Sequence, residues 1–128
     1  PEAVAVGSVA TADVDNGLVF APIGRVVGAR SGDKGGDANL GVWARSDPAY
    51  AWLDEFLTVE RLRELIPEAR DLTMERYRLP NLRAVNFVLV GFLGEGVASS
   101  TKLDPQAKSL GEYFRAKVVP IPEAVLAF

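Results

Sequence analysis

The sequence predicts an α+β fold, a two-layer sandwich whose antiparallel or mixed, four- to five-stranded sheet carries helices on one face. Three observations lead to this prediction. Strand-like segments come in pairs separated by helical segments, one strand-like segment is apolar almost throughout, and the helical segments open with N-cap residues. The predicted order is β-β-α(α)-β-β-α, with or without a last strand.

The first two strands are expected to form a hairpin-like unit. Residues 23–29 are rich in β-branched side chains, which favour strands. In residues 38–44 the apolar side chains alternate, so that Leu40, Val42 and Ala44 share one face. The glycine-rich residues between the two segments then form their connection.

Two helices are expected to follow the hairpin. Ser46 is suited to cap the first helix, and Pro48 fits its first turn. Thr58 is suited to cap the second helix, which has apolar residues at helical spacing. Pro67 ends this helix because proline has no N–H to donate.

A second pair of strands and a last helix complete the predicted domain. Residues 72–79 carry charges that indicate an edge strand, whereas residues 84–93 are nearly all apolar, as in a central strand. Asp104 and Pro105 are typical of a helix start. Residues 118–122 are extended, and their prolines confine them to the place of a fifth, edge strand. This arrangement is ferredoxin-like in a loose sense.

The chain has the length of one domain. Its 128 residues can bury a sizeable core, and 48% hydrophobic with 24% charged residues is typical of globular proteins. Residues 1–17 are rich in small residues and end in a turn signal. We therefore expect a linker or flexible N-terminal arm at residues 1–17 and a single domain at residues 18–128.

Two missing residue types narrow the possible chemistry. The chain has no Cys, which excludes disulfides, thiolate catalysis and iron–sulfur clusters. It also has no His, the commonest general base and transition-metal ligand. An enzyme built from this chain would depend on carboxylates, Lys, Arg, hydroxyl groups or the residues of a partner.

Charge and hydropathy also bear on partners and location. The formal net charge is −3 and the pI is near 5.0, which argues against nucleic-acid binding. No apolar run approaches the ~18 residues that a membrane-spanning helix needs. Residues 1–12 carry no basic residue before their apolar part, so no secretory leader is expected. A cytoplasmic protein is the resulting expectation.

Residues 30–39 are the most unusual segment of the chain. A plain connection between strands needs only two to five turn residues, without the two basic and two acidic residues found here. Glycines allow positive φ and let a ligand approach main-chain N–H groups. We predict an anion-binding loop, with Arg30 and Lys34 as charged donors. Its predicted ligand-binding residues are Arg30, Ser31, Gly32, Asp33, Lys34, Gly35, Gly36, Asp37 and Asn39.

The alternative is a rigid hairpin loop without a ligand. In that case Asp33 and Asp37 would bond to their own backbone, as aspartates in turns often do.

A second polar segment precedes the last predicted helix. Ser99, Ser100 and Thr101 lie just before a helix N-terminus, where free N–H groups and the helix dipole attract anions. These residues are therefore further candidates for ligand binding. In the alternative interpretation, Thr101 and Asp104 only cap the helix.

Two residues within the predicted strands are assigned to packing. Asn86 is expected to be a core amide with a hydrogen-bond partner, and the alternative is that it points into a cleft. Trp43 is expected to pack, because no basic surface around it could follow a nucleic-acid backbone.

Catalytic residues are indicated only weakly. Asp33 and Lys34 could form a proton-transfer pair, with Ser99 as a nearby hydroxyl. Asp33, Asp37 and Glu95 could hold Mg²⁺ or Ca²⁺, but the spacing of Asp33 and Asp37 does not match the EF-hand pattern. We expect neither a metal nor another cofactor.

Three segments of the sequence resemble one known family. They are GARSGDKGGDANLGVWAR at residues 28–45, LPNLRAVNF at 79–87 and GEGVASSTKLDPQAK at 94–108. These strings resemble the C-terminal region of the acyclic terpene utilisation protein A (AtuA-like) family. The resemblance implies a small ferredoxin-fold domain that usually follows a large N-terminal domain. It also implies a connection to bacterial degradation of acyclic terpenoids through acyl-CoA intermediates.

Three functions remain open from the sequence. The first is an accessory domain that binds an anionic small molecule (a carboxylate, a phosphate or a CoA ester) or completes the site of a larger AtuA domain on a separate chain. The second is a small enzyme acting on acyl-CoA or hydroxy-acid substrates through Lys34 and Asp33. The third is an oligomerisation domain that pairs through residues 118–128. A homo-oligomer is expected.

Overall fold

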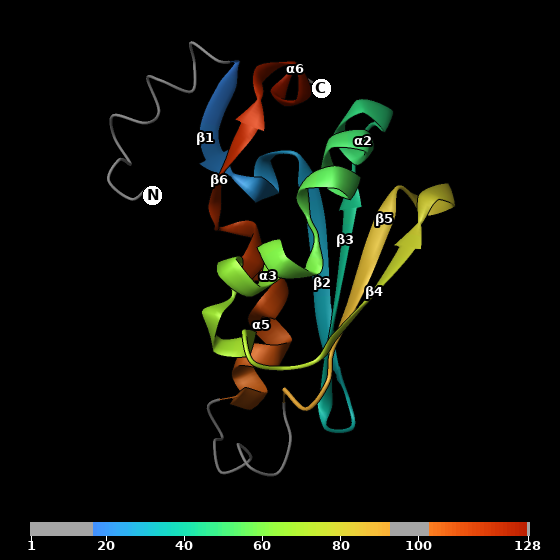
Figure 1. Cartoon of the computed structure of the whole chain (residues 1–128), viewed down its shortest axis with the longest axis vertical. Coiled ribbons are helices and arrows are strands. Elements are labelled where there is room, and N and C mark those ends of the chain that lie inside the picture. Colours follow the sequence, from blue (N-terminus) through green and yellow to red (C-terminus); the bar gives the residue numbers. More distant parts are fainter. Residues whose placement is uncertain (1–16, 93–102, 128) are drawn as a thin grey trace.

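A computed structural model describes residues 17–92 and 103–127 of the chain. It confirms the predicted α+β class (Figure 1). The larger elements are β1 (Leu18–Pro22), β2 (Val27–Lys34), β3 (Asp37–Ala44), α2 (Asp47–Phe56), α3 (Val59–Leu65), β4 (Met74–Leu79), β5 (Ala84–Leu89), α5 (Leu103–Arg115), β6 (Val118–Pro122) and α6 (Glu123–Leu126). Short 3-10 helices lie at η2 (Ile23–Arg25), η3 (Pro67–Ala69) and η4 (Pro80–Leu82).

The main sheet has four antiparallel strands in the order β2-β3-β5-β4. Helices α3 and α5 lie on one of its faces (Figure 1), and α5 packs closely along β2. Leu40 of β3 and Phe87 of β5 point to this covered face and are fully buried. The predicted central position of β5 and the predicted edge position of β4 are both confirmed.

A second, two-stranded sheet was not predicted. β6 was expected as a fifth strand of the main sheet, but it pairs antiparallel with β1, from Leu18 opposite Pro122 to Pro22 opposite Val118. A strand with prolines can serve only as an edge, and β1 provides another edge strand. The pair lies at the end of the molecule opposite the β2–β3 turn (Figure 1).

The predicted helix caps are present. Ser46 Oγ accepts a hydrogen bond from the Ala49 N–H at 3.1 Å, and Thr58 Oγ1 accepts one from the Arg61 N–H at 3.1 Å. Helix α3 ends at Leu65, just ahead of Pro67. Local sequence signals therefore set both helix starts, since each cap contact spans only three residues.

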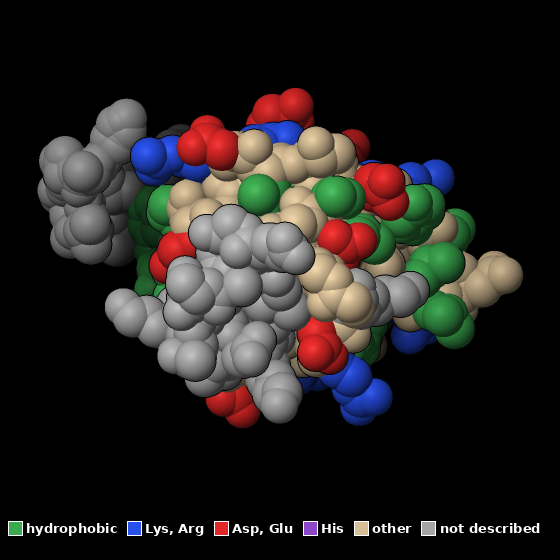
Figure 2. Space-filling view, turned by 90° about the horizontal axis from the view of Figure 1, so that it is seen from below, with side chains coloured by type: hydrophobic (Ala, Val, Ile, Leu, Met, Phe, Trp, Pro, Cys, Tyr) green, Lys and Arg blue, Asp and Glu red, His purple; other side chains and the backbone are tan. Residues whose placement is uncertain are grey.

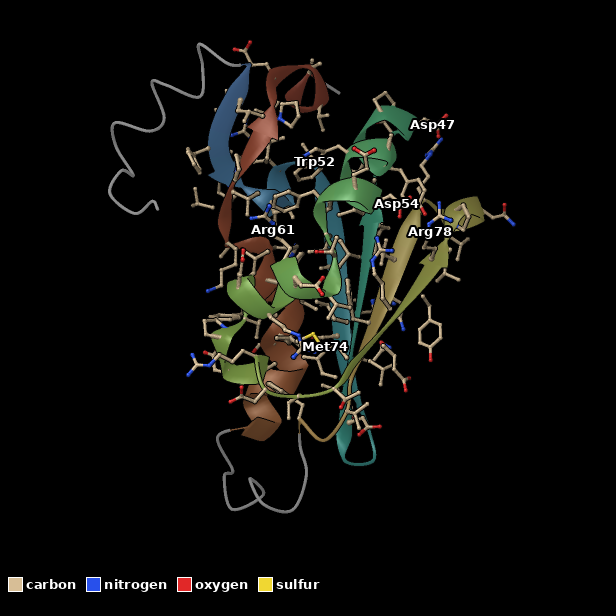
Figure 3. The ribbon with its side chains drawn as sticks, in the orientation of Figure 1. Asp47, Trp52, Asp54, Arg61, Met74 and Arg78 are labelled. Carbon is tan, nitrogen blue, oxygen red and sulfur yellow. The ribbon has the colours of Figure 1, made fainter. Side chains whose placement is uncertain are left out.

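The edge strand β4 is tied to helix α2 by an ion-pair network. Arg78 donates from Nε to Asp54 Oδ1 at 3.0 Å and from Nη2 to Asp54 Oδ2 at 2.9 Å (Figure 3). Arg76 donates to the Asp54 and Leu57 carbonyl oxygens at the end of α2, at 2.8 and 3.0 Å. The hydrogen bonds from Arg78 lower the pKa of Asp54, and Arg76 adds to this shift while partial burial opposes it.

Part of the C-terminal segment packs against its own domain. Val125 in α6 is buried, and Leu126 packs partly against the core. Among residues 17–92 and 103–127, no helix has both the length and the apolar character needed to cross a bilayer.

Candidate functional site

The glycine-rich segment is mostly strand. The ladder between β2 and β3 continues to the pair Lys34–Asp37, so that only Gly35 and Gly36 form the turn. Gly35 has φ +65°, which favours glycine there. Gly32 pairs with Asn39 inside the ladder. The expected ten-residue loop is therefore a tight hairpin, in which only Gly35 and Gly36 lie outside the strand ladder.

Two predicted ligand-binding residues hold the hairpin in the fold. Ser31 Oγ accepts a hydrogen bond from the Gly111 N–H of α5 at 2.8 Å. A Cβ on Gly111 would lie 3.2 Å from the Ala29 carbonyl oxygen, so glycine lets the helix approach β2 closely. Asp37 Oδ1 accepts a hydrogen bond from the Gly91 N–H at 2.7 Å. Both contacts secure the edge hairpin to distant parts of the chain.

The second face of the main sheet is its open face. Among the described residues, no helix packs on it, whereas α3 and α5 cover the other side (Figure 1). The strand register arranges this face in rows across the sheet. The three complete rows are Gly28–Trp43–Ala84–Leu79, Arg30–Gly41–Asn86–Tyr77 and Gly32–Asn39–Val88–Glu75.

A shallow hollow lies on the open face over Gly41. Its volume is roughly 530 Å³, and it is lined by Arg30, Asn39, Trp43 and Asn86, with Ser31, Gly32 and Asp33 toward the β2 edge. Asn39 Nδ2 donates a hydrogen bond to Asn86 Oδ1 at 3.2 Å. A Cβ on Gly41 would come 3.4 Å from this same oxygen. Small residues in β2 and β3 therefore leave the space that the polar side chains surround.

Arg30 provides an exposed positive charge at this hollow. Within the described part of the chain it has no hydrogen-bond or ion-pair partner, whereas Arg76, Arg78 and Arg83 each bind a carboxylate. Figure 2 looks onto the end of the molecule with the β2–β3 turn and shows Asp and Glu side chains spread across it. Arg30 is therefore a described cation that lines the hollow and has no carboxylate partner among the described residues.

The other predicted site residues are not brought to this hollow by any described contact. The side chain of Lys34 lies outside what the structure describes, and so do Ser99, Ser100 and Thr101. Asp33 is exposed and has no partner within residues 17–92 and 103–127. The described residues contain no group of three carboxylates that could hold a metal ion.

Asn86 and Trp43 belong to the hollow, although the sequence interpretation assigned both to packing. Asn86 does have the hydrogen-bond partner that was expected, but it lies on the open face, half-buried, between the buried Val85 and Phe87. The alternation of side chains in a strand is the signal that places Asn86 opposite the core.

A second hollow lies between η3 and α5. It is lined by Ile66, Glu68, Phe92, Ser109, Leu110 and Tyr113 and has a volume of about 80 Å³. Sites for small ligands usually measure about 300–1,000 Å³. The hollow on the open face is therefore the better candidate.

A comparison of the sequence with known protein families identifies the family of this chain. A family description, the AtuA ferredoxin-like domain, matches residues 21–120, which is most of the chain. The chain belongs to the AtuA ferredoxin-like domain family. This AtuA-like domain is thus an accessory domain of AtuA-like proteins, and the match covers both the open face and the helices behind it. No curated protein and no solved structure was found to be similar.

Proposed function

We propose that this AtuA-like domain binds an anionic small molecule, a carboxylate or a phosphate, in the hollow on its open face. The observation that carries the proposal is Arg30, an exposed guanidinium without a partner among the described residues, beside two amides and over a glycine. The proposal moves the predicted site from the glycine turn to the sheet, and keeps Arg30 and Asn39 as binding residues.

The donors at the hollow suit an oxyanion. A guanidinium presents five N–H groups and matches carboxylate and phosphate oxygens in a bidentate manner. Asn86 uses its oxygen to accept from Asn39, and its amide N–H groups have no partner among the described residues, so they can donate to a ligand. Because Gly41 has no side chain, the ligand can approach the sheet itself.

The hollow supports binding better than catalysis. Its described lining offers Arg30, two amides, an indole and the exposed Asp33, and no described contact joins these groups into an acid–base pair. We therefore assign the domain the task of holding the charged part of a ligand, or of completing the site of the larger AtuA domain. The sequence-based alternative of Lys34/Asp33 catalysis has no described geometry in its favour.

Thermal unfolding of the full chain with phosphate, citrate, CoA and a short acyl-CoA tests this proposal. A ligand at about 100 times its dissociation constant stabilises the folded state by about 2.7 kcal/mol. We expect at least one compound to raise the midpoint in the original chain and to lose this effect in Arg30→Ala. Arg70→Ala is the matched control, because Arg70 is also exposed but lies away from the open face. Equal shifts in both variants, or no shift with any compound, would contradict the proposal.

A further inference from the structure

Among residues 17–92 and 103–127, no helix or strand covers the hollow on the open face. Small-molecule sites commonly bury about 70–90% of their ligand. Here Trp43, Tyr77 and Leu79 on the same face are 37%, 49% and 39% exposed, so exposed apolar surface borders the polar hollow on one side. Large exposed apolar side chains that gather on a sheet face favour packing against another surface.

The pattern of residues on the open face is self-complementary. Consider a two-fold axis that runs parallel to the strands between β3 and β5: it places β2 over β4 and β3 over β5 of a second copy. Each row then lies over itself in reverse order. Trp43 faces Ala84 of the second copy, and Gly41 faces Asn86. In these two rows large residues meet small ones, as interdigitating sheets require, whereas in the third row Asn39 faces Val88.

The charges at the two edges of the open face match in the same arrangement. Arg30 on β2 faces Tyr77 on β4 of the second copy, with Glu75 one row further on. Tyr77 donates a hydrogen bond from its hydroxyl to Glu75 at 2.8 Å, which holds the carboxylate beside the ring. A guanidinium can bind both an aromatic face and a carboxylate. The two-fold axis creates this contact twice.

We propose that a second copy of this chain covers the open face through this two-fold axis. The proposal rests on the proposed function in one respect: the second copy supplies the roof of the anion site, with its Tyr77 and Asn86. Two strands of eight residues and two of six, about 4.8 Å apart and rising about 3.3 Å per residue, present roughly 450 Å² per copy. Stable interfaces bury about 800 Å² per partner. The smaller area here implies a weak dimer, which forms only at higher protein concentration.

Sedimentation of the full chain without any added anion tests the dimer directly. We expect a monomer–dimer equilibrium within a series from about 1 to about 300 μM, which brackets the affinity expected of a small interface. Arg30→Glu and Glu75→Arg should each weaken dimerisation at least about tenfold, because like charges then meet at two places. The double variant Arg30→Glu/Glu75→Arg should restore it to within about threefold, and Arg70→Glu should have no effect.

Three results would overturn the proposal. They are a monomer throughout the series, a dimer that neither single charge reversal weakens, and two weakened single variants that the double variant does not rescue. The first would leave the large domain of AtuA-like proteins as the next partner to test on the open face. All variants change exposed side chains, and circular dichroism will show whether each is folded.

A second measurement separates this inference from the proposed function. Glu75→Arg leaves Arg30, Asn39 and Asn86 of the hollow unchanged, so a loss of citrate binding in this variant supports a roof supplied by the second copy. If the monomeric Glu75→Arg variant binds citrate as tightly as the original chain, the second copy does not cover the anion site. A dimer that binds no anion contradicts the proposed function and leaves the dimer itself supported.

Discussion

The indole of Trp43 lies over Gly28, its partner in the β2–β3 ladder, on the open face of the sheet. A Cβ on Gly28 would come within 2.3 Å of Trp43 Cζ2 and 2.4 Å of Trp43 Cε2. The ring therefore occupies the space that a side chain at position 28 would need. This contact fixes one side of the proposed anion site, because Trp43 also lines the hollow.

Gly28→Ala should destabilise the domain by about 1–3 kcal/mol, because the added methyl group forces the indole out of its place. Urea unfolding measures this change. Gly32→Ala is the matched control, since it lies in the same strand and nothing stands within 4 Å of its added Cβ. We expect that control to be neutral or slightly stabilising. An equal loss in both variants would contradict the close contact between Gly28 and Trp43.

We expect the carboxylate of Asp37 to stabilise the folded domain. Its carboxylate accepts the Gly91 N–H at 2.7 Å, and Gly91 has φ +80°. Asp37→Ala should therefore lower the free energy of unfolding by about 1–3 kcal/mol, the usual cost of losing a hydrogen bond to a charged group. Asp33→Ala serves as the control, and its effect should stay within about 0.5 kcal/mol. The idea fails if chemical denaturation finds Asp37→Ala as stable as the control.

The stabilising effect of Asp54 should disappear in acid. Its pKa is lowered in the folded state, first by the hydrogen bonds from Arg78, so the ionised form is favoured on folding. The contribution is then complete above the unfolded pKa of about 3.9 and is lost as pH falls through the folded pKa. The difference in unfolding free energy between the original chain and Asp54→Asn should be constant above about pH 5 and shrink below about pH 4.

The same pH series in an Arg78→Ala background provides the control for Asp54. Without the main partner, the effect of Asp54→Asn should be smaller and should depend less on pH. A difference that grows as the pH falls would show that the sign of the shift is wrong.

Asn39→Asp should separate binding from folding. The substitution keeps the size of the side chain, replaces the donor to Asn86 and adds a negative charge beside the hollow. Affinity for citrate should fall at least about tenfold, because like charges repel at close range. Asn81→Asp adds the same charge at an exposed position in η4 and should bind normally. Calorimetric titration gives both affinities, and equal values would place the anion elsewhere.

Local features of this fold could be predicted from the sequence. The caps Ser46 and Thr58 each contact a residue three positions on, and the alternation in residues 38–44 marks the covered face of β3. The charges of β4 correctly indicated an edge strand. In each case the signal lies within one element, so no knowledge of distant parts of the chain is needed.

Contacts between distant segments could not be predicted in this way. Ser31 bonds to a helix residue 80 positions away in the sequence, and Asp37 bonds to a turn residue 54 positions away. Strand β6 pairs with β1, the first strand of the domain in sequence. The same limit affected the candidate site. Its charged residue, Arg30, stood out in the sequence, but only the sheet register shows that Asn86 lies in the same row, on the other side of Gly41.

An NMR titration of the ¹⁵N-labelled full chain with citrate tests the central claim most directly. The account predicts that the signals of Arg30 and Gly41 and the side-chain amide signals of Asn39 and Asn86 shift together and saturate. Signals from the Gly35–Gly36 turn should change little. Shifts confined to that turn, or none at any citrate concentration, would contradict an anion site on the open face of the sheet.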